Sequence, residues 1–467
     1  MKELIGKARR IENKFPNKLV INNKDISEPK DIAEQFNKFF TNIGPKLASN
    51  IPEATKPFQS FLNETQTTMS SDALSVSELK EAFYSLKTNK SPGYDEVSFN
   101  IVGKCFGELN DPLKYLFGLS LKDGVFPDHL KIAKVTPLFK SGDPANISNY
   151  RPISVLPCFS KILERIMYNR LYKYMTENNL LYPKQFGFRN GHSTDHAIAQ
   201  LVDQIHESFE KDQYTLGVFI DLSKAFDTVD HSILLEKLEI YGVNESNLDW
   251  FRSYLTGRQQ YIKIDENLET HRQNIVCGVP QGSILGPLLF LLYVNDLPNS
   301  STYLDPVMFA DDTNLFLANR SIQELFSIAN KELNKISDWF TANKLSLNVT
   351  KTKFSLFHKA SRKDDIPLKL PILKINNHQI ERVESIKFLG VLLDENLCWK
   401  DHIKYIENKI AKSIGLLYRA KPYLDKKSLI VLYFSYVHTY LNYANLAWGS
   451  TNRTNSKKLG SQQKHAV

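Results

Sequence analysis

The sequence predicts an α+β fold, and three patterns support this prediction. The apolar run at residues 216–220 ends in Asp221 and is typical of a strand buried on both faces. Two further apolar runs flank Asp311-Asp312 and predict an antiparallel hairpin with acids at its turn. Apolar residues spaced three and four apart, before and after these strands, predict amphipathic helices.

Helical periodicity begins near the N-terminus. A looser stretch at residues 52–71, rich in Thr, Ser and Pro, predicts a linker after the first helix. Ser75 and Glu78 then form a capping box, which predicts the start of the next helix. The apolar positions of the first helix are Ile32, Phe36, Phe40, Ile43 and Leu47.

The second half of the chain carries similar signals. Ile233, Leu234 and Leu238 form a helical stripe that Gly242 closes, and residues 288–294 predict a buried helix. The charged, Pro-containing stretch 361–371 predicts a surface loop. A late amphipathic helix carries Ile403, Ile406, Ile410, Ile414 and Leu417.

Composition and charge limit the classes of protein. The chain has 467 residues, of which 42% are hydrophobic, so it can bury a large core. Its net charge is +8, and residues 401–467 contain eleven Lys or Arg against three Asp or Glu. This basic tail favours contact with nucleic-acid phosphates, with a solvated surface as the alternative. Four widely spaced cysteines form no CxxC pair, which argues against a zinc site or a disulfide scaffold and fits a reducing compartment. There is no apolar signal core and no apolar run of membrane-spanning length.

The acids are the strongest chemical signal. Two adjacent carboxylates repel each other unless a cation neutralises them. An acid at a strand end and two acids at a hairpin turn can converge, and three carboxylates that hold two Mg²⁺ ions suit in-line phosphoryl transfer. The structural alternatives are an ordinary hairpin turn for Asp311-Asp312 and a helix cap for Asp221.

A glycine- and proline-rich loop at residues 277–287 lies between the two acidic sites and lets the backbone approach a ligand closely. Together these blocks resemble the reverse transcriptases of non-LTR (LINE-type) retrotransposons, most closely the jockey and CR1-like elements. The resemblance covers most of the chain. Its other blocks are residues 90–95, 137–143, 149–154, 185–189, 348–353 and 387–391.

The resemblance implies a right-hand polymerase with fingers, palm and thumb, and an antiparallel palm sheet. It predicts a pre-polymerase segment and linker at 1–71, fingers at 72–213, a catalytic palm at 214–392 and a thumb at 393–467. These elements usually encode an endonuclease ahead of the polymerase, which this sequence lacks. The last residues read as the middle of a helix, so we expect a truncated element.

The resemblance also implies the catalytic residues. Asp221, Asp311 and Asp312 match the family's catalytic aspartates and are the expected metal ligands. The carbonyl of Leu222 is expected to add a ligand to the nucleotide-bound ion. The expected cofactor is a pair of Mg²⁺ ions, with Mn²⁺ as the alternative. Lys351 matches the general acid for the pyrophosphate leaving group, although Lys353 could take that role instead.

Four further residues match the family's nucleotide site. Lys140 and Arg151 are expected to grip the triphosphate, as a point charge and a fork of donors respectively. Phe226 is expected beneath the sugar, where its ring would exclude a 2′-hydroxyl, and Gln281 is expected to support the nucleotide and template. The alternatives are a solvated Lys140, a core Phe226 and a Gln281 that makes only backbone bonds.

The resemblance predicts an RNA-directed DNA polymerase that extends a primer 3′-hydroxyl. Its partners would be an RNA template, a DNA primer and deoxynucleoside triphosphates, in the nucleus or the cytoplasm. A group II intron-type enzyme would share this site. A viral RNA polymerase usually has Gly where this chain has Ala310. The alternative from another class is a catalytically inactive or domesticated nucleic-acid-binding remnant.

Overall fold

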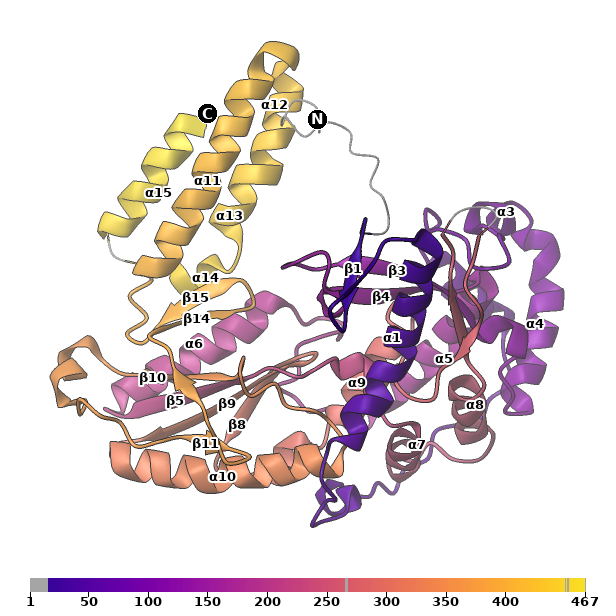
Figure 1. The fold of residues 1–467 in the computed structure, drawn as a ribbon, viewed down its shortest axis with the longest axis horizontal. Helices are drawn as coiled ribbons and strands as arrows, with labels where there is room; N and C mark the ends of the chain where they lie inside the picture. Colours follow the sequence, from indigo (N-terminus) through magenta and orange to yellow (C-terminus); the bar gives the residue numbers. More distant parts are fainter. Residues whose placement is uncertain (1–15, 265–267, 450, 452, 467) are drawn as a thin grey trace.

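The computed structural model describes residues 16–264, 268–449, 451 and 453–466, so the first fifteen residues of the expected pre-polymerase segment lie outside it. Three regions are visible in Figure 1. A mixed helical and sheet region lies at the right, a five-stranded sheet rests on a long helix at the lower left, and a column of C-terminal helices rises at the upper left.

The five-stranded sheet carries the predicted strand and the predicted hairpin. Its order is β13-β10-β5-β9-β8, and all pairs are antiparallel except β10 with β13, so the sheet is mixed rather than purely antiparallel. The central strand β5 is buried along its whole length, as predicted. The strands are β5 (Tyr214–Ile220), β8 (Asp305–Phe309), β9 (Asp312–Asn319), β10 (Lys353–Phe357) and β13 (Glu381–Arg382).

Side-chain alternation along β5 explains why both faces are covered. Leu216, Val218 and Ile220 point into the core that includes α10 (Ile322–Ala342). Phe219 points to the opposite face and joins a second core with α6 (Thr194–Glu210) and the C-terminal helices. The strand end that carries Asp221 is therefore held rigidly between two layers.

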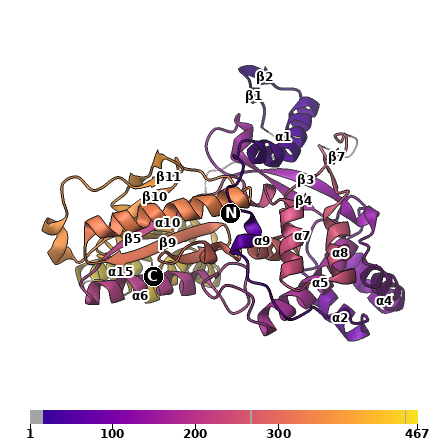
Figure 2. The same ribbon diagram turned by 90° about the horizontal axis from the view of Figure 1, so that it is seen from below.

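A second, four-stranded sheet has the order β4-β3-β6-β7. Strands β3 and β4 of this sheet belong to the predicted fingers range, 72–213. Strands β6 and β7 belong to the predicted palm range, 214–392, so the sheet contains strands from both ranges. Helix α1 (Pro29–Ser49) packs on this sheet through Ile32, Phe36 and Phe40, as its periodicity predicts (Figure 2). The strands are β3 (Ile132–Phe139), β4 (Tyr150–Val155), β6 (Gln259–Ile262) and β7 (Gln273–Asn274).

Helices surround this second sheet. The predicted helix start is confirmed, because Ser75 Oγ accepts the Glu78 N–H, but the other half of the capping box is not seen, because the Glu78 carboxylate accepts hydrogen bonds from Arg170. The buried helix predicted at 288–294 is α9, and Gly242 follows the end of α7 with a φ of +85°. The helices are α2 (Val76–Tyr84), α3 (Phe99–Lys104), α4 (Phe106–Lys122), α5 (Cys158–Glu177), α7 (His231–Ile240), α8 (Glu245–Leu255) and α9 (Gly286–Val294).

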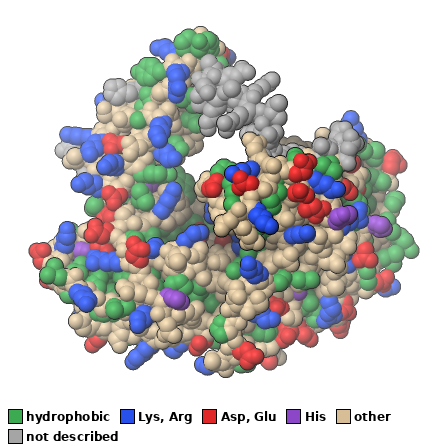
Figure 3. Space-filling model, viewed as in Figure 1, with side chains coloured by type: hydrophobic (Ala, Val, Ile, Leu, Met, Phe, Trp, Pro, Cys, Tyr) green, Lys and Arg blue, Asp and Glu red, His purple; other side chains and the backbone are tan. Residues whose placement is uncertain are grey.

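The C-terminal region begins with the hairpin of β14 (Ser385–Phe388) and β15 (Val391–Asp394). The predicted late helix is α11, and its isoleucines are buried against the second core. Figure 3 shows a hollow between this helical column and the region of β3 and β4, with Lys and Arg side chains along the column. The helices are α11 (Lys400–Ala420), α12 (Lys426–Tyr433), α13 (Thr439–Asn442), α14 (Asn445–Trp448) and α15 (Arg453–Ala466).

Two small hairpins were not predicted. They are β1 (Leu19–Ile21) with β2 (Lys24–Ile26), and β11 (Lys374–Ile375) with β12 (His378–Gln379). Each turns through an Asn-Asn pair whose two residues have positive φ, the requirement of a type I′ turn. The strands are two or three residues long, which is too short for alternation to be recognised.

Candidate active site

The three aspartates converge because their strands are neighbours. Ile220 at the end of β5 pairs with Thr313 on the antiparallel strand β9. The residue after Ile220, Asp221, therefore stands opposite the residue before Thr313, which is Asp312. Neighbouring strands lie about 4.8 Å apart. Asp311 occupies the tight β8–β9 turn beside them. The structure thus brings together the acids that the sequence singled out.

The carboxylates perturb one another. Burial, and then the negative charge of Asp221, raises the pKa of Asp311 above its usual range. Desolvation by the surrounding residues, followed by the charges of Asp311 and Asp221, raises the pKa of Asp312 to about 6, although this side chain reaches solvent. Like charges forced together account for part of both shifts, and a bound cation would relieve them.

Asp221 does not cap a helix, which removes the structural alternative for this residue. The cap positions of the following elements are Lys224 and Asp230. The partner of the Asp221 carboxylate is Lys351, whose Nζ lies 3.8 Å from Oδ2. The Asp221 side chain therefore remains available to a ligand.

The turn that carries Asp311 has a specific brace. Ala310 has a φ of +55°, a conformation that is uncommon for residues other than glycine. Gln185 Oε1 accepts the Ala310 N–H at 2.9 Å, and Gln185 Nε2 donates to the Ala310 carbonyl at 3.3 Å. A Cβ at Gly187 would lie 2.2 Å from the Ala310 nitrogen, so only glycine permits this approach. The sequence shows Gln185 and Gly187 within a recognised block but not this contact.

Basic side chains approach the acids from the second sheet. Lys140 follows β3 and Arg151 lies on β4, in adjacent strands, and both side chains are exposed. Their positive charges oppose the rise in the pKa of Asp311. Lys224 links the two sheets, because its Nζ donates to the carbonyls of Ser148 and Tyr150 at 3.1 and 3.0 Å. Sequence reasoning gave Lys224 no role, and its left-handed φ of +54° carries no sequence signal.

Phe226 lies in the short 3₁₀ turn Ala225–Asp227 after β5. Its half-buried ring stacks on Phe290 of α9 at 4.5 Å between centroids and meets Phe188 edge-on at 6.2 Å. The residue therefore packs on the core through one ring face while remaining partly open to the site.

Gln281 uses its side chain and is not limited to backbone bonds. Its Nε2 donates to Asp227 Oδ1 at 2.8 Å, and its backbone carbonyl accepts the Ser154 N–H at 2.7 Å. With its amide N–H directed at Asp227, Gln281 Oε1 remains as an acceptor. Burial raises the pKa of Asp227 to about 6, while the bond from Gln281 and the charge of Lys224 lower it.

The two lysines considered as the general acid differ in their surroundings. Lys351 is mostly exposed and lies beside Asp221, whereas Lys353 at the start of β10 pairs with Glu381 of β13. Leu222 forms a β-bridge with Leu347, which fixes the backbone next to Asp221.

The N-terminal helix supports the floor of this site. Gly44 on α1 packs so closely that an added Cβ would lie 2.2 Å from the Asp227 carbonyl oxygen and 2.5 Å from Cys277 Sγ. Gly278, with a φ of +82°, approaches the Asp227 backbone from the other side. The turn that carries Phe226 is therefore clamped between α1 and the glycine-rich loop.

The donor chemistry of the site fits a divalent cation. Carboxylate and carbonyl oxygens are the ligands that Mg²⁺ prefers, and this ion usually takes one or two protein carboxylates plus water and substrate phosphates. Within the described residues, however, no group of three or more His, Cys, Asp or Glu side chains is arranged so that it could hold a metal ion. The side-chain types therefore fit Mg²⁺, but the described side chains do not form a complete set of metal ligands.

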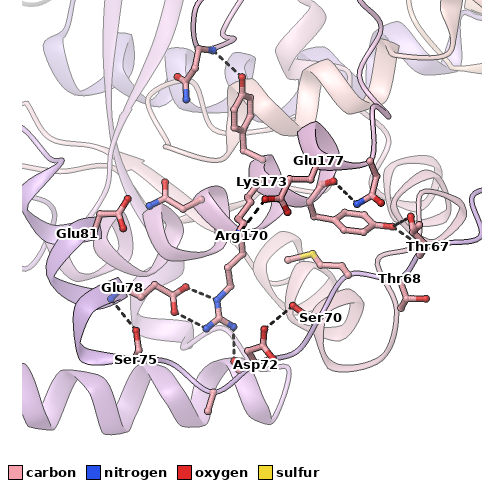
Figure 4. Close-up of a pocket in the computed structure, with 17 residues that line it drawn as sticks. Thr67, Thr68, Ser70, Asp72, Ser75, Glu78, Glu81, Arg170, Lys173 and Glu177 are labelled. Atoms are coloured by element: carbon pink, nitrogen blue, oxygen red, sulfur yellow. Dashed lines mark hydrogen bonds and ion pairs between the residues drawn. The ribbon is translucent and has the colours of Figure 1, made fainter.

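A cavity of about 960 Å³ between α2 and α5 is a different feature (Figure 4). Its central cation is already paired, since Arg170 bonds both carboxylate oxygens of Glu78 and the Asp72 backbone carbonyl. None of the candidate site residues lines it. This cavity is therefore separate from the candidate site at the acids.

Comparison with known proteins identifies the family of the chain. The family model described as "Reverse transcriptase (RNA-dependent DNA polymerase)" matches residues 139–393. The chain is 29% identical over 462 residues to "Probable RNA-directed DNA polymerase from transposon BS" of Drosophila melanogaster, covering 94% of this chain and 49% of that protein. It is 28% identical over 414 residues to "RNA-directed DNA polymerase from mobile element jockey" of Drosophila funebris, covering 86% and 44% respectively.

A third relative, "Probable RNA-directed DNA polymerase from transposon X-element" of Drosophila melanogaster, is 28% identical over 438 residues, which are 92% of this chain and 46% of that protein. The chain thus spans about half the length of these curated relatives. In the described part of the chain, no helix has both the length and the apolar character needed to cross a bilayer.

Proposed function

The chain belongs to the reverse transcriptase family, and from this premise we propose that it catalyses RNA-templated DNA synthesis, extending a primer 3′-hydroxyl with deoxynucleoside triphosphates. The observation that carries the proposal is the convergence of Asp221 with Asp311 and Asp312 at adjacent strand ends. RNA template, DNA primer and nucleotide would be its partners, met in the nucleus or the cytoplasm.

The proposed arrangement is a right hand. The palm, at residues 214–392, contains the five-stranded sheet and the acids. The fingers, at 72–213, contribute β3 and β4 with Lys140 and Arg151. The thumb, at 393–467, is the C-terminal helical column, and the hollow in Figure 3 would receive the primer–template duplex. Residues 1–71 form the pre-polymerase segment and linker, of which α1 contacts the site.

Asp221, Asp311 and Asp312, with the Leu222 carbonyl, are the proposed ligands of two Mg²⁺ ions, with Mn²⁺ as the alternative. Such ions activate the attacking hydroxyl and stabilise the leaving oxygen. The protein itself supplies the other contributions. These carboxylates must be ionised to bind a metal ion. The raised pKa values of Asp311 and Asp312 oppose ionisation, and the positive charge of a bound cation would lower them again.

The cations around the acids bind and orient the substrate. Arg151 offers a planar fork of donors to phosphate oxygens, and Lys140 a point charge, from adjacent strands. Lys351, beside Asp221, is the proposed proton donor to the departing pyrophosphate. The pairing of Lys353 with Glu381 favours Lys351 over Lys353 for this role.

Phe226 and Gln281 are the proposed selectivity residues. The Phe226 ring, backed by Phe290, presents an edge that would collide with a 2′-hydroxyl and so selects deoxynucleotides. Gln281 directs its amide N–H to Asp227, which leaves Oε1 to accept a hydrogen bond from the nucleotide.

Primer extension on an RNA template with Mg²⁺ tests the proposal. Wild-type protein should extend the primer with deoxynucleotides, and Asp311→Asn should abolish extension while primer–template affinity stays within about twofold. Retained activity in Asp311→Asn within about tenfold of wild type, or about 1.4 kcal/mol in the barrier, would refute the metal-ligand assignment. Wild-type binding without any extension would favour the inactive nucleic-acid-binding alternative.

A further inference from the structure

The carboxylate of Asp227 lies beside the candidate site and has no role of its own in the proposed mechanism. Asp227 is the last residue of the 3₁₀ turn that carries Phe226, and its Oδ1 accepts the Gln281 Nε2–H at 2.8 Å. The second carboxylate oxygen, Oδ2, is buried and has no hydrogen-bond partner among the described residues. Burying a charged oxygen without a hydrogen bond opposes folding, so the stability of the fold does not account for an acid at this position.

The backbone on both sides of Asp227 is bonded to the glycine-rich loop. On one side, the Val279 N–H donates to the Phe226 carbonyl at 2.9 Å. On the other side, the Gly278 N–H donates to the Val229 carbonyl at 2.7 Å. Because these two bonds hold the turn and the loop together, the Asp227 carboxylate has little freedom to turn away from the loop.

The charge of this carboxylate determines how the Gln281 amide is turned. An ionised carboxylate only accepts hydrogen bonds, so only the NH₂ end of an amide can face it. Burial raises the pKa of Asp227 to about 6, while the bond from Gln281 and the charge of Lys224 lower it, so the carboxylate is ionised at neutral pH. A neutral side chain such as asparagine can donate as well as accept, and would leave the amide free to adopt either orientation.

We propose that Asp227 is a positioning residue for nucleotide binding, which holds the Gln281 amide so that its oxygen, and not its nitrogen, meets the nucleotide. The inference rests on the proposed function, in which Gln281 contacts the nucleotide. Asp227 acts through Gln281 and does not touch the nucleotide itself, because Oδ1 is occupied by the amide and Oδ2 is buried. The acceptor presented in this way favours a nucleotide with a hydrogen-bond donor at that point and disfavours one with an acceptor there.

The test measures nucleotide affinity in a complex that cannot react. The primer ends in a 3′-deoxynucleotide, and the dissociation constant of the next correct deoxynucleotide is measured from its stabilisation of a fluorescently labelled primer–template complex. Gln281→Glu should weaken nucleotide binding about tenfold, the order of one lost hydrogen bond, because two carboxylates then face each other and repel. Asp227→Ala should weaken it to a similar extent, because the amide loses its anchor. The exchange variant, Asp227→Asn with Gln281→Glu, restores a donor facing an acceptor and should bind within about threefold of wild type.

The matched control is Asp230→Asn, which removes the same charge from a residue that pairs with Lys344, while asparagine can still cap α7. This control should bind nucleotide within about twofold of wild type. Recovery of affinity in the exchange variant supports the proposal, because a role confined to folding would lower the active fraction and not the nucleotide affinity of the remainder. The proposal is overturned by wild-type affinity in both single variants, by no recovery in the exchange variant, or by an equal loss in the control. Extension of an unblocked primer tests the proposed function separately, since a protein that binds nucleotide without extending would contradict that function alone.

Discussion

Gly44→Ala should disturb nucleotide selection from a helix that contributes no catalytic group. The added Cβ would lie 2.2 Å from the Asp227 carbonyl oxygen and 2.5 Å from Cys277 Sγ, whereas ordinary contact begins near 3.4 Å. The nearer atom is backbone, so α1 or the turn Ala225–Asp227 must move by about 1 Å. Phe226 lies in that turn and would shift relative to Phe290.

The size of the effect follows from two opposing contributions. Overpacking a well-packed site costs about 1–3 kcal/mol, and replacing Gly by Ala inside a helix returns up to about 1 kcal/mol. We expect a net loss of about 1–2 kcal/mol, measured as the change in free energy of unfolding in urea. If about 1.4 kcal/mol of the strain falls on the turn, the ratio of kcat/KM for deoxynucleotide over ribonucleotide should fall about tenfold.

Gly118→Ala is the matched control, because this glycine also lies within a helix but has nothing within 4 Å of an added Cβ. It should be neutral or stabilising by up to about 1 kcal/mol, with unchanged selectivity. Wild-type stability and wild-type selectivity in Gly44→Ala would refute the reasoning, since the clamp around Asp227 would then be loose enough to absorb a methyl group.

Three further outcomes are expected. Phe226→Ala should raise ribonucleotide incorporation relative to deoxynucleotide incorporation, measured as the ratio of kcat/KM values, and an unchanged ratio would leave this ring a packing residue alone. Burial lowers the pKa of His402 to about 4, against about 6.5 in the unfolded chain, so the contribution of this residue to folding stability is complete above pH 6.5. As the pH falls toward 4, about 3 kcal/mol of that stability is lost. The urea midpoint of His402→Gln should therefore change less between pH 7 and pH 4.5 than that of the wild type, and an equal change would contradict this prediction. Neutralising four basic residues of α11 should flatten the salt dependence of duplex binding by about 0.9 for each phosphate that the helix no longer neutralises, and an unchanged slope in a folded variant would remove this face from the duplex. The four are Lys404, Lys409, Lys412 and Arg419.

Local patterns predicted the elements whose periodicity is complete. The β5 strand, the α9 helix and the isoleucine stripe of α11 were predicted correctly because each buries its apolar residues at the period of its own geometry. The parallel partner of β10 could not be predicted. Strand β13 is two residues long, and its place at the sheet edge depends on the path of the chain and not on alternation.

The acids of the site were predictable because two of them are adjacent and the third ends a buried strand. Their supports were not, because they depend on contacts between distant parts of the chain. Gln185 braces Ala310 across 125 residues, and Lys224 donates to carbonyls more than 70 residues away. A glutamine at 185 or a lysine at 224 gives no signal in the sequence that its side chain will contact a distant part of the backbone.

Helix α1 shows what this difference means for the proposed mechanism. Its periodicity predicted a helix but not its partner, and the sequence indicated only a segment that precedes the polymerase. In the structure its apolar face shares a core with β3, β4 and β6, and Gly44 near its end contacts the turn of Phe226. One helix thus joins the sheet that carries Arg151 to the floor beneath the proposed sugar site. A substitution in α1 should therefore alter both nucleotide selection and the free energy of unfolding. Helix α1 differs in this respect from a linker, whose removal would affect neither.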